Sequence, residues 1–358
     1  MKIRILALTM VLAMALTACG TGGTPDPTPT SEPAATQTPA PTPTPEPTPT
    51  PYAGPVNPLT GLPMDEEKIA SRPVGVMLNN IKDALPQLGI SQADIIYEAR
   101  VEYGITRLFA LYQNVDDVGV IGSVRSARPD FLEIVAGHDA ILLHAGGSQD
   151  AYNIIDSGKV TSFDCVRSPL LNVLFWRDKE RMKTMSIEHT LVTSGEWIRN
   201  YLPKTNTRML HKDDFSYEMQ FVADGTPENG QKAMTITVPF SDYKTGMFKY
   251  DEKSGKYLVG QHGEAHIDGN SGEQMAVTNV IIINTKLSVI DSGGHVAMDL
   301  TEGDGWYACG GKIIPIKWSK DSFNDQFVYK TTDGELLKIG VGKSYVNIIP
   351  IENSITVG

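Results

Sequence analysis

The chain has 358 residues, of which 41% are hydrophobic, and it carries a formal net charge of −11. This length exceeds one typical domain and is sufficient for two units that each bury a core. The acidic balance, without a basic stripe, argues against nucleic acid as a partner and against electrostatic binding to anionic lipid.

The first eighteen residues have the layout of a secretory signal peptide, with basic residues, then an apolar run over 5–16, then small residues. That run is shorter than the roughly 20 apolar residues that span a bilayer, and no later run approaches this length. Leu16 to Cys19 (LTAC) resembles a bacterial lipobox. We therefore expect a signal peptide over 1–18 and a diacylglyceryl group on Cys19, which anchors the protein to the lipid bilayer on the extracytoplasmic side of the cell membrane. An ordinary cleaved signal with an accidental cysteine is the alternative.

A segment rich in proline and threonine follows. Residues 24–51 contain eleven prolines and almost no apolar side chains, which predicts an extended polyproline II spacer without a core. At about 3.1 Å per residue, this spacer reaches at most on the order of 90 Å. We assign 19–56 to the lipidated cysteine and this tether.

The residues from 57 to 205 alternate between strand and helix patterns. Short apolar runs typical of buried strands cover 73–79 (PVGVMLN) and 140–144 (AILLH). Apolar residues with helical spacing cover 130–138 and 194–201. This mixture predicts a layered α/β domain over 57–205.

From residue 206 the pattern changes to paired strands. The run of four aliphatic residues at 280–283 marks 277–290 as a central strand. We expect a β-rich domain over 206–358 and, for the whole chain, an α+β or α/β fold class. Glycine-containing hairpin turns lie in the middle of three segments, which are 247–260, 306–318 and 327–339.

Arginine is concentrated in the first of these two regions. Nine of the ten arginines that follow the tether lie between Arg72 and Arg199, and only Arg208 lies beyond them. Arginine suits bidentate recognition of carboxylate or phosphate, whereas lysine is a solvated point charge. A polar site is therefore expected in the α/β region.

The stretch over 94–113 has the densest pattern of charges in that region. A two-residue turn at 103–104 would place Glu98 and Glu102 diagonal to Arg107 on the facing strand, so that two carboxylates flank one arginine. Apolar residues share the face of Arg107, which favours a partly buried site. The alternative is a solvated strand face with ordinary ion pairs.

Further polar residues lie at predicted strand and helix ends. Arg125 and Arg128 precede a helix that begins at about Pro129, and a helix N-terminus with two arginines favours an anion. His144 ends a predicted strand, where open α/β sheets place their ligands. Ion pairs within the helix and a plain strand-to-helix turn are the alternatives. The candidate ligand-binding residues are Glu98, Glu102, Arg107, Arg125, Arg128, His144, Arg177 and His189.

One pair of histidines has the spacing of a zinc protease motif. His262 and His266 are four residues apart, but the glutamate between them is Glu264, and the motif requires it one position earlier. The glycine-rich setting also argues against a helix there. We therefore predict no metal and no cofactor.

Several segments of the chain resemble the YerB-like family of Gram-positive lipoproteins. That family has an N-terminal and a C-terminal domain of unknown function, so the resemblance implies an anchored two-domain protein and no established reaction. Tyr103 departs from the pattern, because a glycine is expected there. The segments that carry the resemblance are 57–63 (NPLTGLP), 91–94 (SQAD), 102–107 (EYGITR), 125–129 (RSARP), 144–148 (HAGGS) and 175–177 (FWR), and more loosely 279–282 (NVII), 318–320 (WSK), 333–334 (DG) and 342–343 (GK).

We expect a binding or scaffolding lipoprotein whose first domain holds an anionic ligand, such as a cell-wall precursor or an anionic glycan, in one pocket where the arginines converge. The alternative is an envelope enzyme that acts on a phosphodiester or pyrophosphate, with a histidine or Glu98 as acid or base. A purely structural partner would instead have all its arginines in internal ion pairs. The ligand, the oligomeric state and the pairing of Cys165 with Cys309 stay open.

Overall fold

The computed structural model describes residues 53–358, which belong to one compact unit. The predicted signal peptide, Cys19 and nearly all of the tether lie outside the described residues. No helix within 53–358 is long and apolar enough to cross a membrane.

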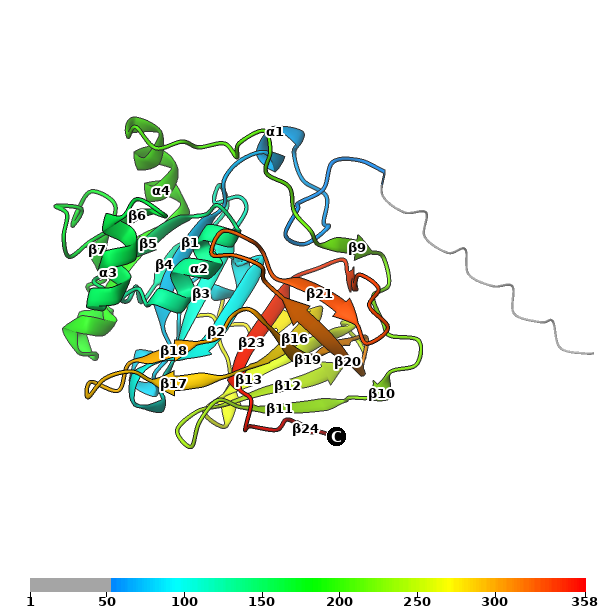
Figure 1. The fold of residues 1–358 in the computed structure, drawn as a ribbon. Coiled ribbons are helices and arrows are strands. Elements are labelled where there is room, and N and C mark those ends of the chain that lie inside the picture. Colours follow the sequence, from blue (N-terminus) through cyan, green and yellow to red (C-terminus); the bar gives the residue numbers. More distant parts are fainter. Residues whose placement is uncertain (1–52) are drawn as a thin grey trace, which may run out of the picture. The chain divides into compact units, whose positions relative to one another are not determined.

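A sheet of 11 strands forms the centre of this unit, and both halves of the chain contribute to it (Figure 1). Its strands follow the order β10-β20-β19-β16-β23-β2-β3-β1-β5-β6, and β21 pairs with β20 at one end. The strands are β1 (Val74–Asn79), β2 (Ile95–Arg100), β3 (Thr106–Tyr112), β5 (Ile141–His144), β6 (Thr161–Asp164), β10 (Gln231–Lys232), β16 (Asn279–Thr285), β19 (Glu302–Cys309), β20 (Lys312–Ser319), β21 (Val328–Thr331) and β23 (Ser344–Pro350).

Strand β23 joins the two halves of this sheet. It comes near the end of the chain, yet it lies between β2 and β16 and pairs with both in parallel, as the red strand beside cyan β2 in Figure 1 shows. All seven of its residues are buried, because a parallel strand in the middle of a sheet is covered on both faces. The predicted division into domains at 205 and 206 stays a prediction, but one sheet extends across it.

The two faces of the sheet are covered differently. Helix α2 (Pro129–Gly137) packs on one face, where Phe131 and Val135 belong to the same core as Met77 and Phe109. Helix α3 (Gln149–Asp156) contributes Ala151 to this core.

A second sheet and a small three-stranded sheet share the core of the opposite face, which includes residues such as Val76 of β1, Phe248 of β12 and Leu191 of β8. The second sheet has the order β14-β13-β12-β11-β24, with β15 beside β13, and the small sheet has the order β4-β8-β7. The remaining elements are α1 (Glu66–Ile69), α4 (Gly195–Tyr201), β4 (Val120–Gly122), β7 (Trp176–Arg177), β8 (Leu191–Ser194), β9 (Gln220–Val222), β11 (Thr235–Pro239), β12 (Thr245–Asp251), β13 (Lys256–Gln261), β14 (Glu264–Ala265), β15 (Ala276–Val277), β17 (Leu287–Val289), β18 (Val296–Met298), β22 (Lys338–Gly340) and β24 (Thr356–Val357).

The fold class predicted from the sequence is confirmed, since helices and strands mix in the first half and strands dominate the second. The strands expected over 73–79 and 140–144 are β1 and β5, and the expected helices are α2 and α4. The first two hairpins are also confirmed, as β12 with β13 and β19 with β20.

Two details of the second half differ from the expectation. The strand predicted over 277–290 is interrupted at Lys286 and divides into β16 and β17. The third predicted hairpin is reduced to a bridge between Lys330 and Leu336, because β22 leaves it to pair with β9 in parallel. In the first case β17 forms a hairpin of its own with the nearby β18, and in the second β22 pairs with β9, which lies more than a hundred residues earlier in the sequence.

A buried ion pair connects the central sheet to the second sheet. Glu98 of β2 is 1% exposed, and the Nζ of Lys244, just before β12, lies 3.0 Å from its Oε1. Tyr345 of β23 donates a hydrogen bond of 2.6 Å to the Oε2 of Glu98. Residues from three distant parts of the chain therefore satisfy one buried carboxylate, which would be costly to bury alone.

We predict that a fragment of residues 57–205 does not fold stably. It lacks β23, so β2 would become an exposed edge, and it lacks Lys244, so Glu98 would lose its cation. Urea unfolding followed by tryptophan fluorescence should show one cooperative transition for 53–358 and none for the fragment. A cooperative transition of the fragment at the midpoint of the longer chain would contradict this prediction and support two independent domains.

Candidate functional site

The turn between β2 and β3 is one residue longer than expected. It is the 3-10 turn η3 (Glu102–Gly104), in which Tyr103 has a left-handed φ of 56°. As a result, Arg107 pairs with Ala99 across the strands. A shift of one residue moves every side chain of a strand to the other face. The expected position of Glu98 beside Arg107 is therefore wrong, and Glu98 lies on the opposite face in its ion pair.

Glu102 binds two arginines. One is Arg107, as predicted from the sequence, and the other is Arg128. The Oε1 of Glu102 lies 2.7 Å from the Nη2 of Arg107 and 2.6 Å from the Nη2 of Arg128. Its Oε2 accepts a further hydrogen bond of 2.9 Å from the Nε of Arg128, so that this pair is bidentate. Arg107 also donates to the carbonyl oxygen of Ser126 at 2.7 Å. One carboxylate thus orients two guanidinium groups.

The electrostatics of this group show a shortage of negative charge. Burial raises the pKa of Glu102, but the hydrogen bond from Arg128 and the charges of both arginines outweigh burial and lower this pKa to about 2. Burial and the charge of Arg128 lower the pKa of Arg107 to about 9, although Glu102 opposes the shift. The charge of Arg125 contributes to this lowering of the pKa of Arg107. An arginine with a lowered pKa would be stabilised by an additional anion.

The segment over 123–127 lies between the ends of two parallel strands. β1 and β5 pair directly over three residues each. Beyond that pairing, the backbone N–H of Arg125 donates to the carbonyl oxygen of Met77 in β1 at 2.9 Å. The backbone N–H of Ala145, which follows β5, donates to the carbonyl oxygen of Arg125 at 3.0 Å. The carboxyl ends of diverging parallel strands are where open α/β sheets bind their ligands. The sheet therefore presents Arg125 at a position suited to a ligand.

Arg125 and Arg177 both reach the 3-10 turn η5 (Ile187–His189). The Nη2 of Arg125 lies 3.2 Å from the Oε2 of Glu188, whose side chain is 50% exposed. The Nη1 of Arg177 donates to the carbonyl oxygen of Ile187 at 2.5 Å. The Nε of Arg125 is buried and has no hydrogen-bond partner among the described residues. These two arginines are therefore less completely neutralised than Arg107 and Arg128.

His189, the last residue of this turn, is held in a neutral form. Its Nδ1 lies 2.9 Å from the Nδ2 of Asn79. Because the amide nitrogen can only donate, Nδ1 is the acceptor. Burial lowers the pKa of His189, which also favours the neutral ring. Asn79 in turn pairs with Arg107 across β1 and β3.

His144 belongs to a neighbouring group and not to the arginines. Its Nδ1 lies 2.8 Å from the carbonyl oxygen of Gly146, so Nδ1 carries the proton and Nε2 the lone pair. The Oδ1 of Asp164 lies 4.0 Å from Nδ1. Burial lowers the pKa of His144, and its Nε2 is buried without a partner among the described residues. The imidazole is therefore a neutral acceptor and cannot supply charge to an anion.

The structure thus brings together Glu102, Arg107, Arg125 and Arg128, which we call the arginine cluster. Arg177 and His189 border it through the 187–189 turn, whereas His144 faces Asp164 and Glu98 faces the second sheet. Within 53–358, no group of three or more histidine, cysteine, aspartate or glutamate side chains is arranged to hold a metal. Cys165 and Cys309 are both free thiols.

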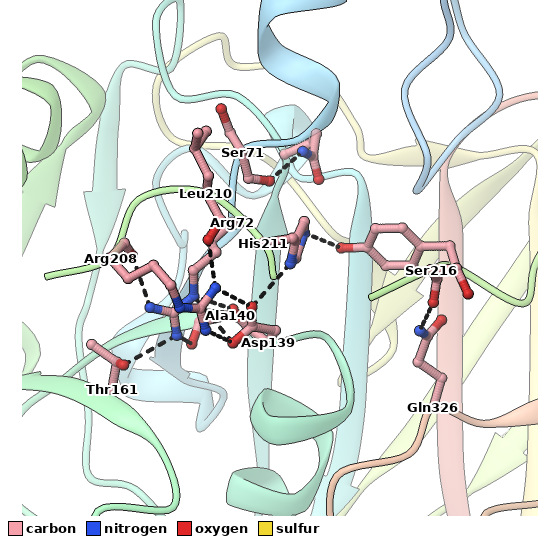
Figure 2. Close-up of polar contacts among 12 residues, drawn as sticks. Ser71, Arg72, Asp139, Ala140, Thr161, Arg208, Leu210, His211, Ser216 and Gln326 are labelled. Carbon is pink, nitrogen blue, oxygen red and sulfur yellow. Dashed lines mark hydrogen bonds and ion pairs between the residues drawn. The ribbon is translucent and has the colours of Figure 1, made fainter. Parts of the chain in front are cut away.

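Sequence analysis missed a second polar group, which we call the Asp139 cluster (Figure 2). Arg208 pairs bidentately with Asp139 at 2.6 and 2.8 Å, and the Nε of Arg72 and the Nδ1 of His211 lie 3.2 and 3.0 Å from the same carboxylate. The aspartate is separated from Arg72 by 67 residues and from Arg208 by 69, so no local motif indicates the group. In the sequence, the one feature that could have indicated this cluster is the position of Asp139 between a predicted helix and a predicted strand.

Two family models match successive parts of the chain. Residues 59–208 match the N-terminal domain, and residues 236–346 the C-terminal domain, of the protein family of unknown function DUF3048. The chain is 29% identical over 300 residues to lipoprotein YerB of Bacillus subtilis (strain 168), covering 82% of this chain and 86% of that protein. The crystal structure of YerB from Bacillus subtilis superposes with a TM-score of 0.73 at 28% identity, covering 85% of this chain and 100% of that chain.

We predict that Glu102→Gln destabilises the protein by about 2 to 4 kcal/mol at pH 7, because the buried Arg107 loses its carboxylate. The pKa of Glu102 is lowered in the folded state, so its contribution is present above its ordinary value of 4.5 and is lost as the pH falls toward about 2. Urea unfolding at pH 7, 4 and 3 should therefore show a difference between wild type and variant that shrinks with acid.

The matched control is Glu180→Gln. Its carboxylate pairs with Lys183 at 2.6 Å, but both side chains are exposed. Exposed pairs contribute little, so we expect almost no change at any pH. A pH-independent loss in Glu102→Gln would mean that its charge does not stabilise the arginines.

Proposed function

The chain belongs to the DUF3048 family, with the N-terminal and C-terminal domains in succession, and we propose that it is a membrane-anchored envelope lipoprotein whose arginine cluster binds an anionic ligand. The ligand would be a phosphate or carboxylate group of a cell-wall precursor or an anionic glycan. The role is binding or scaffolding on the extracytoplasmic side of the membrane.

One observation carries the binding proposal, which is the excess of positive charge at the carboxyl ends of β1 and β5. Three arginines of the arginine cluster have two carboxylate partners, Glu102 and the half-exposed Glu188. Arg125 keeps a buried Nε without a partner among the described residues. Like charges this close repel each other, and a bound anion would relieve this repulsion. A purely structural protein would have every arginine neutralised by internal ion pairs. The Nε of Arg125, which has no hydrogen-bond partner within 53–358, fits that alternative less well.

The anchor is supported by the residues before the folded unit and by one relative. Leu16 to Cys19 has the lipobox pattern, and the similar Bacillus subtilis protein is named a lipoprotein. Two acyl chains on one cysteine give stable attachment to a bilayer. The tether would then hold the folded unit away from the lipid, where it can meet soluble or wall-bound ligands.

Catalysis on a phosphodiester is less well supported than binding. It needs a general acid or base within hydrogen-bond reach of the reacting group. Glu98 is buried on the other face of the sheet beside Lys244, and the ring of His144 faces Gly146 and Asp164. The arginines would stabilise charge, but neither Glu98 nor His144 lies among them, and His189, which borders them, has its Nδ1 occupied by Asn79.

We predict that inorganic phosphate raises the melting temperature of the protein comprising residues 53–358. At ten times the dissociation constant, binding contributes about 1.4 kcal/mol, which corresponds to roughly 2 to 4 °C. Arg125→Gln, which leaves both arginine pairs of Glu102 intact, should reduce this shift, and the Arg125→Ala, Arg128→Ala double variant should abolish it. Differential scanning calorimetry at constant ionic strength measures the shift.

Arg199→Gln is the control for this experiment. Arg199 also pairs with one carboxylate, that of Asp116 at 3.6 Å, but it is 45% exposed and lies away from the cluster. This variant should keep the full response to phosphate. Equal shifts in the double variant and the wild type would show a general salt effect and would refute the arginine site.

A separate prediction concerns the anchor. Cys19→Ala removes the acyl acceptor, so the protein should be released or left unprocessed without unfolding of residues 53–358. Triton X-114 partitioning of cells that express the variant should move the protein from the detergent phase to the aqueous phase. Continued partitioning into detergent of a variant from which the signal peptide has been cleaved would contradict lipidation at this cysteine.

A further inference from the structure

A cavity of about 580 Å³ lies beside the Asp139 cluster, at the other end of helix α2 from the arginine cluster. Its volume falls within the range of roughly 300 to 1,000 Å³ that small-molecule sites occupy. Three separate parts of the chain line it: the first half through Arg72, Ala136 and Thr161, the connecting segment through Arg208, and the second half through Asp325.

Asp139, Arg72 and Arg208 line this cavity as a group that we call its floor, and the Asp139 carboxylate there is already paired with the cationic and donor side chains around it. Its Oδ1 accepts from the Nη2 of Arg208 and lies 3.2 Å from the Nε of Arg72. Its Oδ2 accepts from the Nη1 of Arg208 and contacts the Nδ1 of His211 at 3.0 Å. Figure 2 shows these contacts converging on Asp139 from both arginines and the histidine. The Asp139 side chain is therefore a positioning group for the cations around it.

The arginines, in contrast, keep donors that no described residue uses. A guanidinium group has five N–H donors. Arg208 uses three of them, two on Asp139 and one on the carbonyl oxygen of Leu210, which leaves Nε and one hydrogen of Nη2. Arg72 uses four. Three go to the backbone carbonyl oxygens of Asp139, Arg208 and Ala140 and one to the hydroxyl of Thr161, which leaves one hydrogen of Nη1. The floor thus offers donors and no free carboxylate acceptor.

The charge of the floor and the rim restricts the ligand further. With histidine counted as neutral, two arginines against Asp139 leave one positive charge at the floor, where the side chain of Arg208 is 38% exposed and accessible to a ligand. The exposed rim carries Lys159 and Lys212 against Asp214 and Asp325, which balance each other. A ligand with a single negative charge, oriented inward, would be neutralised at the floor. Polar groups of the ligand could meet both signs of charge at the rim.

One aromatic side chain completes the wall. Phe215 lines the cavity and stacks on the ring of His211, with the ring centroids 4.0 Å apart. This stacking fixes the aromatic ring beside the floor, next to the apolar side chains of Val135 and Val160. The cavity therefore combines a cationic floor with a partly apolar wall, as small-molecule sites do.

We propose that this cavity is a second binding site, which takes a small molecule bearing one carboxylate with that group against Arg208. The planar carboxylate matches the fork geometry of a guanidinium group. Two sources share this chemistry, the C-terminal carboxylate of a short peptide and the carboxylate of an acidic sugar. The site is independent of the arginine cluster and does not depend on the proposed function there.

Saturation-transfer NMR on residues 53–358 tests the proposal with two pairs of probes. Alanyl-alanine and glucuronic acid carry the carboxylate, and alanyl-alaninamide and glucose are their counterparts without it. We expect at least one acid to bind and its counterpart to bind about tenfold more weakly or not at all. Which acid binds identifies the peptide or the sugar as the source. Binding of neither acid, or equal binding of acid and counterpart, would overturn the proposal.

Three variants locate the binding. Ala136→Phe fills the cavity from α2 without changing a charge, and it should abolish binding. Arg208→Lys keeps a cation beside Asp139 but removes the fork, and it should weaken binding about tenfold. The Arg125→Ala, Arg128→Ala double variant should bind the acid normally. Undiminished binding by a folded Ala136→Phe protein would overturn the site, and loss of binding in the double variant would assign the carboxylate to the arginine cluster instead.

Discussion

The parallel pairing of β23 with β2 and β16 is the constraint on which the rest of this structure depends. It closes one sheet from strands that are about 250 residues apart in sequence. Because β23 is buried on both faces, β2 cannot shift its register without moving Tyr345 away from Glu98. The register of β2 in turn fixes the turn at 102–104 and hence the position of Glu102. The position of β23, near the end of the chain, therefore determines the geometry of the arginine cluster.

Three carboxylates of the described residues are each met by a cation from another part of the chain. Glu98 is met by Lys244 of the second sheet, Glu102 by Arg128 of the segment that precedes α2, and Asp139 by Arg208 of the connecting segment. Removal of one partner from such a pair lowers the free energy of unfolding by far more than an exposed ion pair contributes to it. Glu102 and Asp139 each lie beside two arginines. This excess of positive charge suggests ligands, whereas the ion pairs alone do not.

Helix α2 links the two sites that we infer. It begins directly after Arg128 and ends just before the loop that carries Asp139, and its nine residues extend about 14 Å. Its apolar face, with Phe131 and Val135, is packed against the sheet and holds both ends in place. The two sites therefore lie at opposite ends of one helix.

The sequence by itself determined the local features of this protein: the lipobox pattern and the proline-rich segment after it, the alternation of strand and helix before residue 205, two of the three expected hairpins after it, and the concentration of arginine in the first half. These follow from short-range patterns of polarity, proline and glycine. Only the tertiary structure decided the partner of Glu98, the face on which Arg107 lies, and the existence of the Asp139 cluster. The reason is physical, since a turn longer by one residue reverses a strand's faces, and pairs such as Arg208 with Asp139 join positions that no local pattern relates.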